Sequence, residues 1–278
     1  MKPEVRSAPI GIFDSGVGGL SVLNEVRRLL PEEALLYVAD QAHLPYGSLS
    51  LRQIRAFAAG IARYLLEQGA KMIVVACNTA SAAGLQHLRR LWPEVPFVGM
   101  EPAVKPAAEQ TRTGVVGILA TPATFQGPLF ASVVERFAGG AGLLKATCPG
   151  LVSQIEKGEL ETEATRSILE KALRPMLAKG MDCLVLGCTH YPFVLPLIRR
   201  IVGDAVKVID PSPAVARQVA RLLDAGGLRR VTGPEGEVRL CSTGSPLQLG
   251  LLAKKLSGQS WPVSLLRWAE SDGALRPG

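Results

Sequence analysis

The chain has 278 residues, of which 47% are hydrophobic and 20% charged, and its formal net charge is +7. This composition predicts a soluble globular protein with a hydrophobic core, and the length favours one large domain or two small ones. Its apolar runs are too short for a transmembrane helix, and the first residues lack the apolar stretch of a secretory signal. We therefore expect a cytoplasmic protein that does not enter a membrane.

The chain begins with a short apolar strand over residues 9–13. A turn follows, Asp14-Ser15-Gly16-Val17-Gly18-Gly19, and then a helix over about 20–30. A strand, a glycine turn and a helix together form the layout of an anion site, because backbone N–H groups and the helix N-terminus point at a negative group. A tight turn in which Asp14 caps the helix explains the same residues, so both interpretations stay open.

A second strand over 35–39 ends in Asp40 and leads into the turn Pro45-Tyr46-Gly47. This loop either lines a pocket with Tyr46 and backbone amides or forms a surface turn. Ser50 and Gln53 have the spacing of a capping box, which predicts a helix from there to about residue 68.

The same local design occurs twice along the chain. A strand over 72–76 is followed by Cys77-Asn78-Thr79, and a strand over 183–186 is followed by Gly187-Cys188-Thr189-His190. Continuous apolar runs are typical of buried parallel strands, and ligands bind at the carboxyl ends of such strands. Our central hypothesis is that the two cysteines, 111 positions apart, face each other across one substrate.

The stretch between the two copies holds further candidates. A strand over 114–119 precedes Thr121 and Pro122, which suit the N-cap and first position of a helix. Thr121 and Thr124 either cap that helix or donate hydroxyls to a ligand. A strand over 143–147 ends in Cys148, which is interpreted as a packing residue, and the segment 150–158 carries Glu156.

The remaining elements complete the α/β pattern. Helices are predicted over 162–177, 214–223 and 246–256, with strands over 206–209, 238–241 and 262–265, and the tail after Ala269 is predicted to be frayed. Alternating strands and helices indicate parallel sheets. We expect two pseudo-symmetric three-layer α/β domains with mostly parallel sheets and a site in the cleft between them. The first comprises 1–101 plus 213–278, and the second comprises 102–212.

Two facing thiols suggest a definite chemistry. A thiolate takes a proton from one face of a carbon while a thiol returns one to the other, which inverts the carbon, as a racemase does. The developing carboxylate charge needs strong donors, for which Ser15, Asn78, Thr79, Thr189 and the amide of Gly47 are candidates. No lysine lies in a motif that suggests a pyridoxal Schiff base, so we expect no cofactor.

Four other interpretations explain the sequence less well. A single cysteine with His190 suits acyl transfer, but it leaves the second cysteine motif without a purpose. A metal site at Cys188-x-His190 is disfavoured, since the chain has three histidines and no CxxC pair, and a disulfide framework is disfavoured for the same lack of pairing. A non-catalytic role in binding nucleic acid or protein through the basic surface is disfavoured because no basic stretch is interleaved with aromatic residues.

Several motifs resemble those of the glutamate racemases in the aspartate/glutamate racemase family. They are IGIFDSGVGGLSVL, LPYG, VVACNTAS, EPAVKPA, TPAT and LVLGCTHYP, and the resemblance runs from Ile10 to about Leu223. Related aspartate racemases usually have Glu after Cys-Thr, where this chain has His190. The resemblance implies cofactor-independent interconversion of L- and D-glutamate, D-glutamate supply for peptidoglycan, and often a homodimer. Racemisation of a related acidic amino acid such as aspartate remains the alternative.

The resemblance also implies roles for individual residues. Cys77 would deprotonate D-glutamate with Asp14 as its acidic neighbour, and Cys188 would deprotonate L-glutamate assisted by His190 and Glu156. The positions that match substrate contacts are Asp14, Ser15, Pro45, Tyr46, Gly47, Asn78, Thr79, Thr121, Thr124, Thr189 and His190. The chain departs from the family pattern at Ala42-His43, at 150–153 and over the last 50 or so residues.

Overall fold

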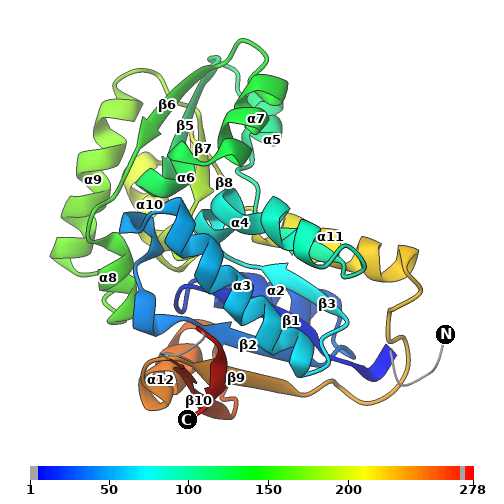
Figure 1. The fold of residues 1–278 in the computed structure, drawn as a ribbon. Helices are drawn as coiled ribbons and strands as arrows, with labels where there is room; N and C mark the ends of the chain where they lie inside the picture. Colours follow the sequence, from blue (N-terminus) through cyan, green and yellow to red (C-terminus); the bar gives the residue numbers. More distant parts are fainter. Residues whose placement is uncertain (1–5, 270–272) are drawn as a thin grey trace.

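The protein is described here by a computed structural model, which covers residues 6–269 and 273–278. Its strands form two sheets that lie in different parts of the molecule (Figure 1). The larger sheet has the order β11-β10-β9-β2-β1-β3-β4. Its strands are β1 (Ile10–Asp14), β2 (Leu35–Ala39), β3 (Met72–Val75), β4 (Phe97–Gly99), β9 (Val238–Ser242), β10 (Val263–Trp268) and β11 (Leu275–Pro277).

The smaller sheet has the order β6-β5-β7-β8, and all of its strands are parallel. Its strands are β5 (Val115–Ala120), β6 (Gly142–Ala146), β7 (Cys183–Gly187) and β8 (Lys207–Ile209). In the larger sheet every neighbouring pair is parallel except β10 and β11. The expected mixed α/β fold with mostly parallel sheets is therefore confirmed.

Helices cover both faces of each sheet. In the larger sheet, one face packs on α3 (Leu51–Glu67) and α4 (Asn78–Leu91). The opposite face packs on α2 (Leu20–Leu29), α11 (Ser212–Ala225) and α12 (Pro246–Ser257). In the smaller sheet, α5 (Val104–Gln110) and α7 (Pro128–Phe137) pack on one face, and α9 (Glu163–Leu177) and α10 (Leu195–Val202) on the other.

Short helical segments complete the loops beside the strand ends. They are η1 (Gln41–His43), η2 (Tyr46–Ser48), α6 (Pro122–Gln126), α8 (Leu151–Glu156) and η3 (Tyr191–Val194). The largest buried cluster contains residues of both sheets, so the two halves share a continuous core. The strands of the larger sheet fall within the first predicted domain and those of the smaller sheet within the second, while the domain boundaries stay a prediction.

Local signals placed two helix starts correctly. Ser50 accepts a hydrogen bond from the Gln53 backbone, and the Gln53 side chain returns one to the Ser50 backbone. Thr121 caps α6 through the Thr124 N–H, with Pro122 at the first helical position. Within residues 6–269 and 273–278, no helix has the length and apolar character needed to cross a bilayer.

The prediction that the chain frays after Ala269 is wrong for its last residues. Leu275–Pro277 form β11, which pairs antiparallel with β10, and Leu275 is buried. Residues 270–272 lie outside the described part. The three-residue edge strand is too short to give a periodic pattern of its own, which explains why its sequence did not reveal it.

Candidate active site

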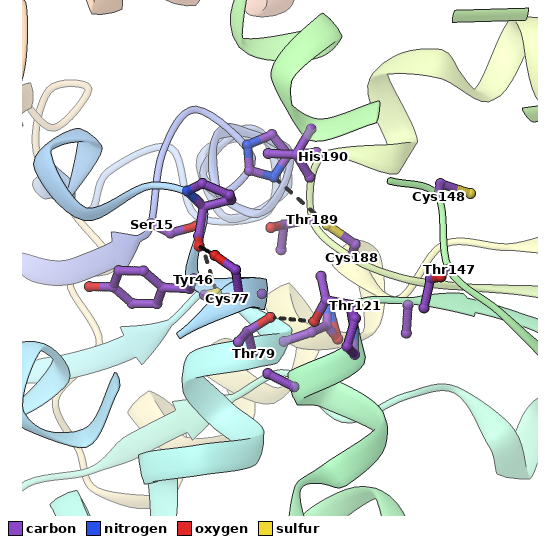
Figure 2. A pocket seen from close by; sticks show the side chains of 18 of the residues that line it. Ser15, Tyr46, Cys77, Thr79, Thr121, Thr147, Cys148, Cys188, Thr189 and His190 are labelled. Carbon is purple, nitrogen blue, oxygen red and sulfur yellow. Dashed lines mark hydrogen bonds between the residues drawn. The ribbon is translucent and has the colours of Figure 1, made fainter. Parts of the chain in front are cut away.

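A cavity of about 430 Å³ lies where the carboxyl ends of the two sheets meet, and both Cys77 and Cys188 line it. Cys77 follows β3 of the larger sheet, and Cys188 follows β7 of the smaller one. Figure 2 shows the two sulfur atoms in the same pocket, with Ser15 beside Cys77 and His190 beside Cys188. The structure thus brings together two cysteines that the sequence separates by more than a hundred residues.

Cys77 forms the N-cap of α4, because its Sγ accepts a hydrogen bond from the Ala80 N–H at 3.4 Å. The Ser15 Oγ lies 4.0 Å from the same sulfur. Burial, and then the nearby carboxylate of Asp14, raise the pKa of the Cys77 thiol well above its usual value. Cys77 is therefore held in its protonated form near neutral pH, as a proton donor requires.

Cys188 has a different partner. Its Sγ lies 3.8 Å from the Nδ1 of His190, whose Nε2 lies 2.7 Å from the Oε1 of Glu156. Burial alone would lower the pKa of His190, but hydrogen bonds to Cys188 and Glu156 raise it well above its usual value. Burial acts to raise the pKa of Glu156, and its contacts with His190 bring it below the usual range. The buried pair is therefore an imidazolium and a carboxylate, which places a cation beside the Cys188 sulfur.

The glycine turn of residues 14–19 does hold anions, but they are carboxylates of the protein itself. The Val17 N–H donates to the Oε1 of Glu156 at 2.7 Å, and the Gly19 N–H donates to the Oδ2 of Asp14 at 2.8 Å. A Cβ at Gly16 would overlap the Glu156 carboxylate, and one at Gly18 would overlap the His190 ring. Glycine is required at these two positions because the turn packs directly against the partners of Cys188.

Asp14 lies behind the pocket wall rather than in it. Burial raises the pKa of its carboxyl, against the opposing effect of His190. Asp14 is fully buried, and the hydroxyl of Thr189 lies 3.5 Å from its Oδ1. Asp14 therefore contacts residues from both cysteine motifs, and any role in the chemistry would be exerted through them.

Polar groups suited to a ligand line the cavity between the cysteines. Both amide atoms of Asn78 are buried, and neither makes a hydrogen bond to any residue that the structure describes. A buried polar group without a partner costs free energy, so this amide is placed to bind a polar ligand. Thr79, Thr121 and Thr124 form a hydroxyl cluster with oxygen–oxygen distances of 2.8 to 3.3 Å.

The other predicted residues divide between the wall and the layer behind it. The wall includes Ser15, Pro45, Tyr46, Gly47, Asn78, Thr79, Thr121, Thr189 and His190. Three predicted residues lie behind it: Asp14, Thr124 and Glu156. The hydroxyl of Tyr46 points away from the cysteines and donates to Asp40 at 2.6 Å, so this side chain offers its ring and backbone to the pocket.

Sequence reasoning missed part of the wall and one contact behind it. Residues 147–150 line the pocket, including Cys148, which the sequence suggested was a packing residue. Burial raises the pKa of Cys148 to about 12, so it does not compete as a thiolate. Its position after a strand, before Pro149 and Gly150, was the available signal. Gln41, which contacts Glu156, lies in no sequence pattern that indicates such a role.

Among the described residues no group of three or more His, Cys, Asp or Glu side chains is arranged to hold a metal ion. All five cysteines are unpaired thiols. The contact between Cys188 and His190 therefore joins a free cysteine to a histidine ring.

Comparisons with known proteins identify the family of the chain. Residues 10–219 match the sequence profile of the Asp/Glu/Hydantoin racemases. A glutamate racemase from Roseiflexus sp. (strain RS-1) is 52% identical over 254 residues, which cover 91% of this chain and 93% of the relative.

Two solved structures share the whole architecture. The glutamate racemase of Bacillus anthracis superposes with a TM-score of 0.86 at 29% identity, covering 94% of this chain and 97% of its own. That of Francisella tularensis, solved in complex with D-glutamate, gives a TM-score of 0.82 at 30% identity, covering 95% and 98%. From its profile, its relatives and its fold, the chain belongs to the Asp/Glu/Hydantoin racemase family.

Proposed function

We propose that the protein interconverts L- and D-glutamate by proton transfer at Cα between two cysteines. The observation that carries this function is that Cys77 and Cys188 line one cavity from the ends of two different sheets. Relatives about half identical over most of the chain are glutamate racemases, which favours glutamate over aspartate as the substrate. A purely structural or nucleic-acid-binding role would leave two thiols in one cavity unexplained.

The surroundings of the two thiols suggest which of them first donates a proton. Burial and Asp14 raise the pKa of Cys77 and keep it protonated, while the His190 cation lies beside Cys188. In the direction from L- to D-glutamate, Cys188 removes the α-proton, and Cys77 delivers a proton to the opposite face. For D-glutamate the roles are exchanged, so the protein must first move the proton from Cys77 to Cys188 through solvent.

The pocket also offers donors for the charge that develops on the substrate. As the α-proton leaves, negative charge spreads into the α-carboxylate, and fixed donors lower the barrier by stabilising it. The unpartnered Asn78 amide, the Ser15 hydroxyl and the Thr79–Thr121 hydroxyls lie along the wall between the cysteines. We assign substrate carboxylate binding to this set.

The wider setting follows from the same assignment. We propose that the reaction needs no cofactor, that its product supplies peptidoglycan synthesis, and that the protein acts in the cytoplasm as a homodimer. Five free thiols suit a reducing compartment. Light scattering coupled to size-exclusion chromatography tests the dimer, and a monomeric mass at assay concentrations would contradict it.

The function is tested by the optical activity of the substrate. Purified protein freed of pyridoxal phosphate and treated with chelator is incubated with L-glutamate, and the circular dichroism of the solution is followed. We expect the signal to decay to zero as the racemic mixture forms, with aspartate turned over far more slowly. A stable signal with L-glutamate, or faster decay with aspartate, would refute the assignment.

A further inference from the structure

Glu156 is held in place by residues from the other half of the molecule. It ends α8, which follows the smaller sheet's β6, yet its carboxylate is bound by the Val17 N–H and by the side chain of Gln41. Gln41 begins η1 directly after β2 of the larger sheet. Its Nε2 donates to the Oε2 of Glu156 at 3.2 Å, while its Oε1 accepts from the Ser242 hydroxyl at 2.7 Å.

These contacts form one hydrogen-bonded chain. It runs from Ser242, at the end of β9, through Gln41 to Glu156, and from there through His190 to the sulfur of Cys188. Ser242 is fully buried and Gln41 half-buried, so the first links of the chain are shielded from competing water. The amide nitrogen of Gln41 donates to a carboxylate and its amide oxygen accepts from a hydroxyl, which fixes the orientation of the amide.

We propose that Gln41 is a positioning residue for the proposed racemisation: it bridges the two halves and fixes the carboxylate that orients His190 against Cys188. The inference rests on the proposed function. Glu156 binds two partners with Oε1, and without Gln41 its Oε2 has no side-chain donor among the described residues. The carboxylate is then free to rotate away from the line between His190 and Val17. Because the bridge spans both sheets, it forms only when the two halves are in contact.

A neutral amide suits this position better than a charged group. The titratable groups that interact with the carboxylate are His190 and Tyr37, and His190 in turn interacts with Cys188 and Asp14. A second carboxylate at position 41 would repel Glu156, and a lysine would compete with His190 for it. Glutamine supplies a donor without changing the charge balance of the site.

Two substitutions test the bridge. Gln41→Met keeps the length of the side chain but removes the donor, and we expect kcat/KM to fall roughly tenfold at every pH, as for loss of a hydrogen bond to a charged group. Gln41→Glu can donate to Glu156 only when protonated. Its kcat/KM, relative to the unsubstituted protein, should therefore rise as the pH falls, whereas the ratio for Gln41→Met stays flat.

Gln248→Met is the matched control, because Gln248 also reaches Glu156 from the larger half, but through the backbone carbonyl. It should leave the pH profile unchanged. A second readout does not depend on activity. The chain has three histidines, so the ¹⁵N spectrum of labelled protein resolves His190, assigned by its loss in His190→Asn. In Gln41→Met the pKa of His190 should move down toward its usual value.

The outcomes separate this inference from the proposed function. If the unsubstituted protein racemises glutamate but Gln41→Met matches it at every pH, or if kcat/KM falls while the His190 titration is unmoved, Gln41 is not a positioning residue. If the unsubstituted protein proves inactive, the proposed function fails, and the His190 titration still decides whether Gln41 holds Glu156. Should Gln41→Met unfold, Ser242→Ala removes the outer link and should shift the titration in the same direction.

Discussion

Gly18 offers a direct steric test of the contact between His190 and Cys188. A Cβ added at this position would overlap the Nδ1 of His190 most closely and would lie 2.7 Å from both the Cε1 of His190 and the Oγ1 of Thr189, whereas ordinary contact begins at 3.4 Å. The imidazole must therefore move by nearly an ångström, and misplacement of that size at a reacting group costs on the order of 10–100-fold in rate. Gly18→Ala should lower kcat/KM by that factor.

The loss must be equal in both directions. Mirror-image products have equal free energy, so kcat/KM for L-glutamate equals that for D-glutamate in any variant, and only kcat and KM can change separately. Circular dichroism started from each enantiomer measures all four constants. A Gly18→Ala protein that folds and racemises at the unsubstituted rate would show that the His190 position has no bearing on the chemistry.

Gly84→Ala is the matched control for this substitution. Gly84 lies within α4, and a Cβ there would meet its nearest neighbour at 3.7 Å, which is ordinary contact. Replacing a glycine inside a helix by alanine stabilises a protein by about 0.5–1 kcal/mol. Gly84→Ala should therefore raise the melting temperature and keep the activity, which separates the effect of an added methyl group from its effect at the site.

Two further predictions concern stability. Lys71→Met leaves the Glu33 carboxylate, 2.5 Å from the Lys71 Nζ, buried without its cation, and should cost about 3–5 kcal/mol in urea unfolding. Lys105→Met, which removes an exposed ion pair, should cost less than about 1 kcal/mol; equal losses would contradict the reasoning. Burial alone would raise the pKa of Asp182, but hydrogen bonds from residues 111–113 lower it to about 2. A carboxyl whose pKa is lower in the folded state stabilises that state at pH values above the pKa it has in the unfolded chain. It loses this contribution as the pH falls through its folded-state pKa. Acid titration of the unfolding free energy should therefore show a loss between about pH 4 and 2 that Asp182→Asn lacks, and parallel curves would contradict it.

The sequence carried most of the local information about this site. The strand-end motifs placed Cys77 and Cys188 correctly, since a buried parallel strand and its polar C-terminal residues form one local pattern. The helix cap at Thr121 was likewise predicted from a local pattern. The structure agrees with both roles considered for this residue, since Thr121 caps α6 and also lines the pocket.

What the sequence left undecided depended on contacts between distant residues. The glycine turn predicted an anion, but no local pattern shows that the anion is Glu156, which lies 139 positions beyond Val17. Gln41 similarly contacts residues 115 and 201 positions away. Such partners are set by how the two halves pack, and packing is determined by the whole chain rather than by any one motif.

The central claim, that two thiols act from opposite faces of one carbon, is tested most directly by turnover in heavy water. L-glutamate is supplied, and the deuterium content of both enantiomers is measured early, before much product has formed. If Cys188 removes the proton and Cys77 delivers a solvent-derived one, the D-glutamate formed carries deuterium at Cα while the remaining L-glutamate does not. Unlabelled D-glutamate, or deuterium entering both enantiomers equally fast from the start, would contradict the two-thiol account.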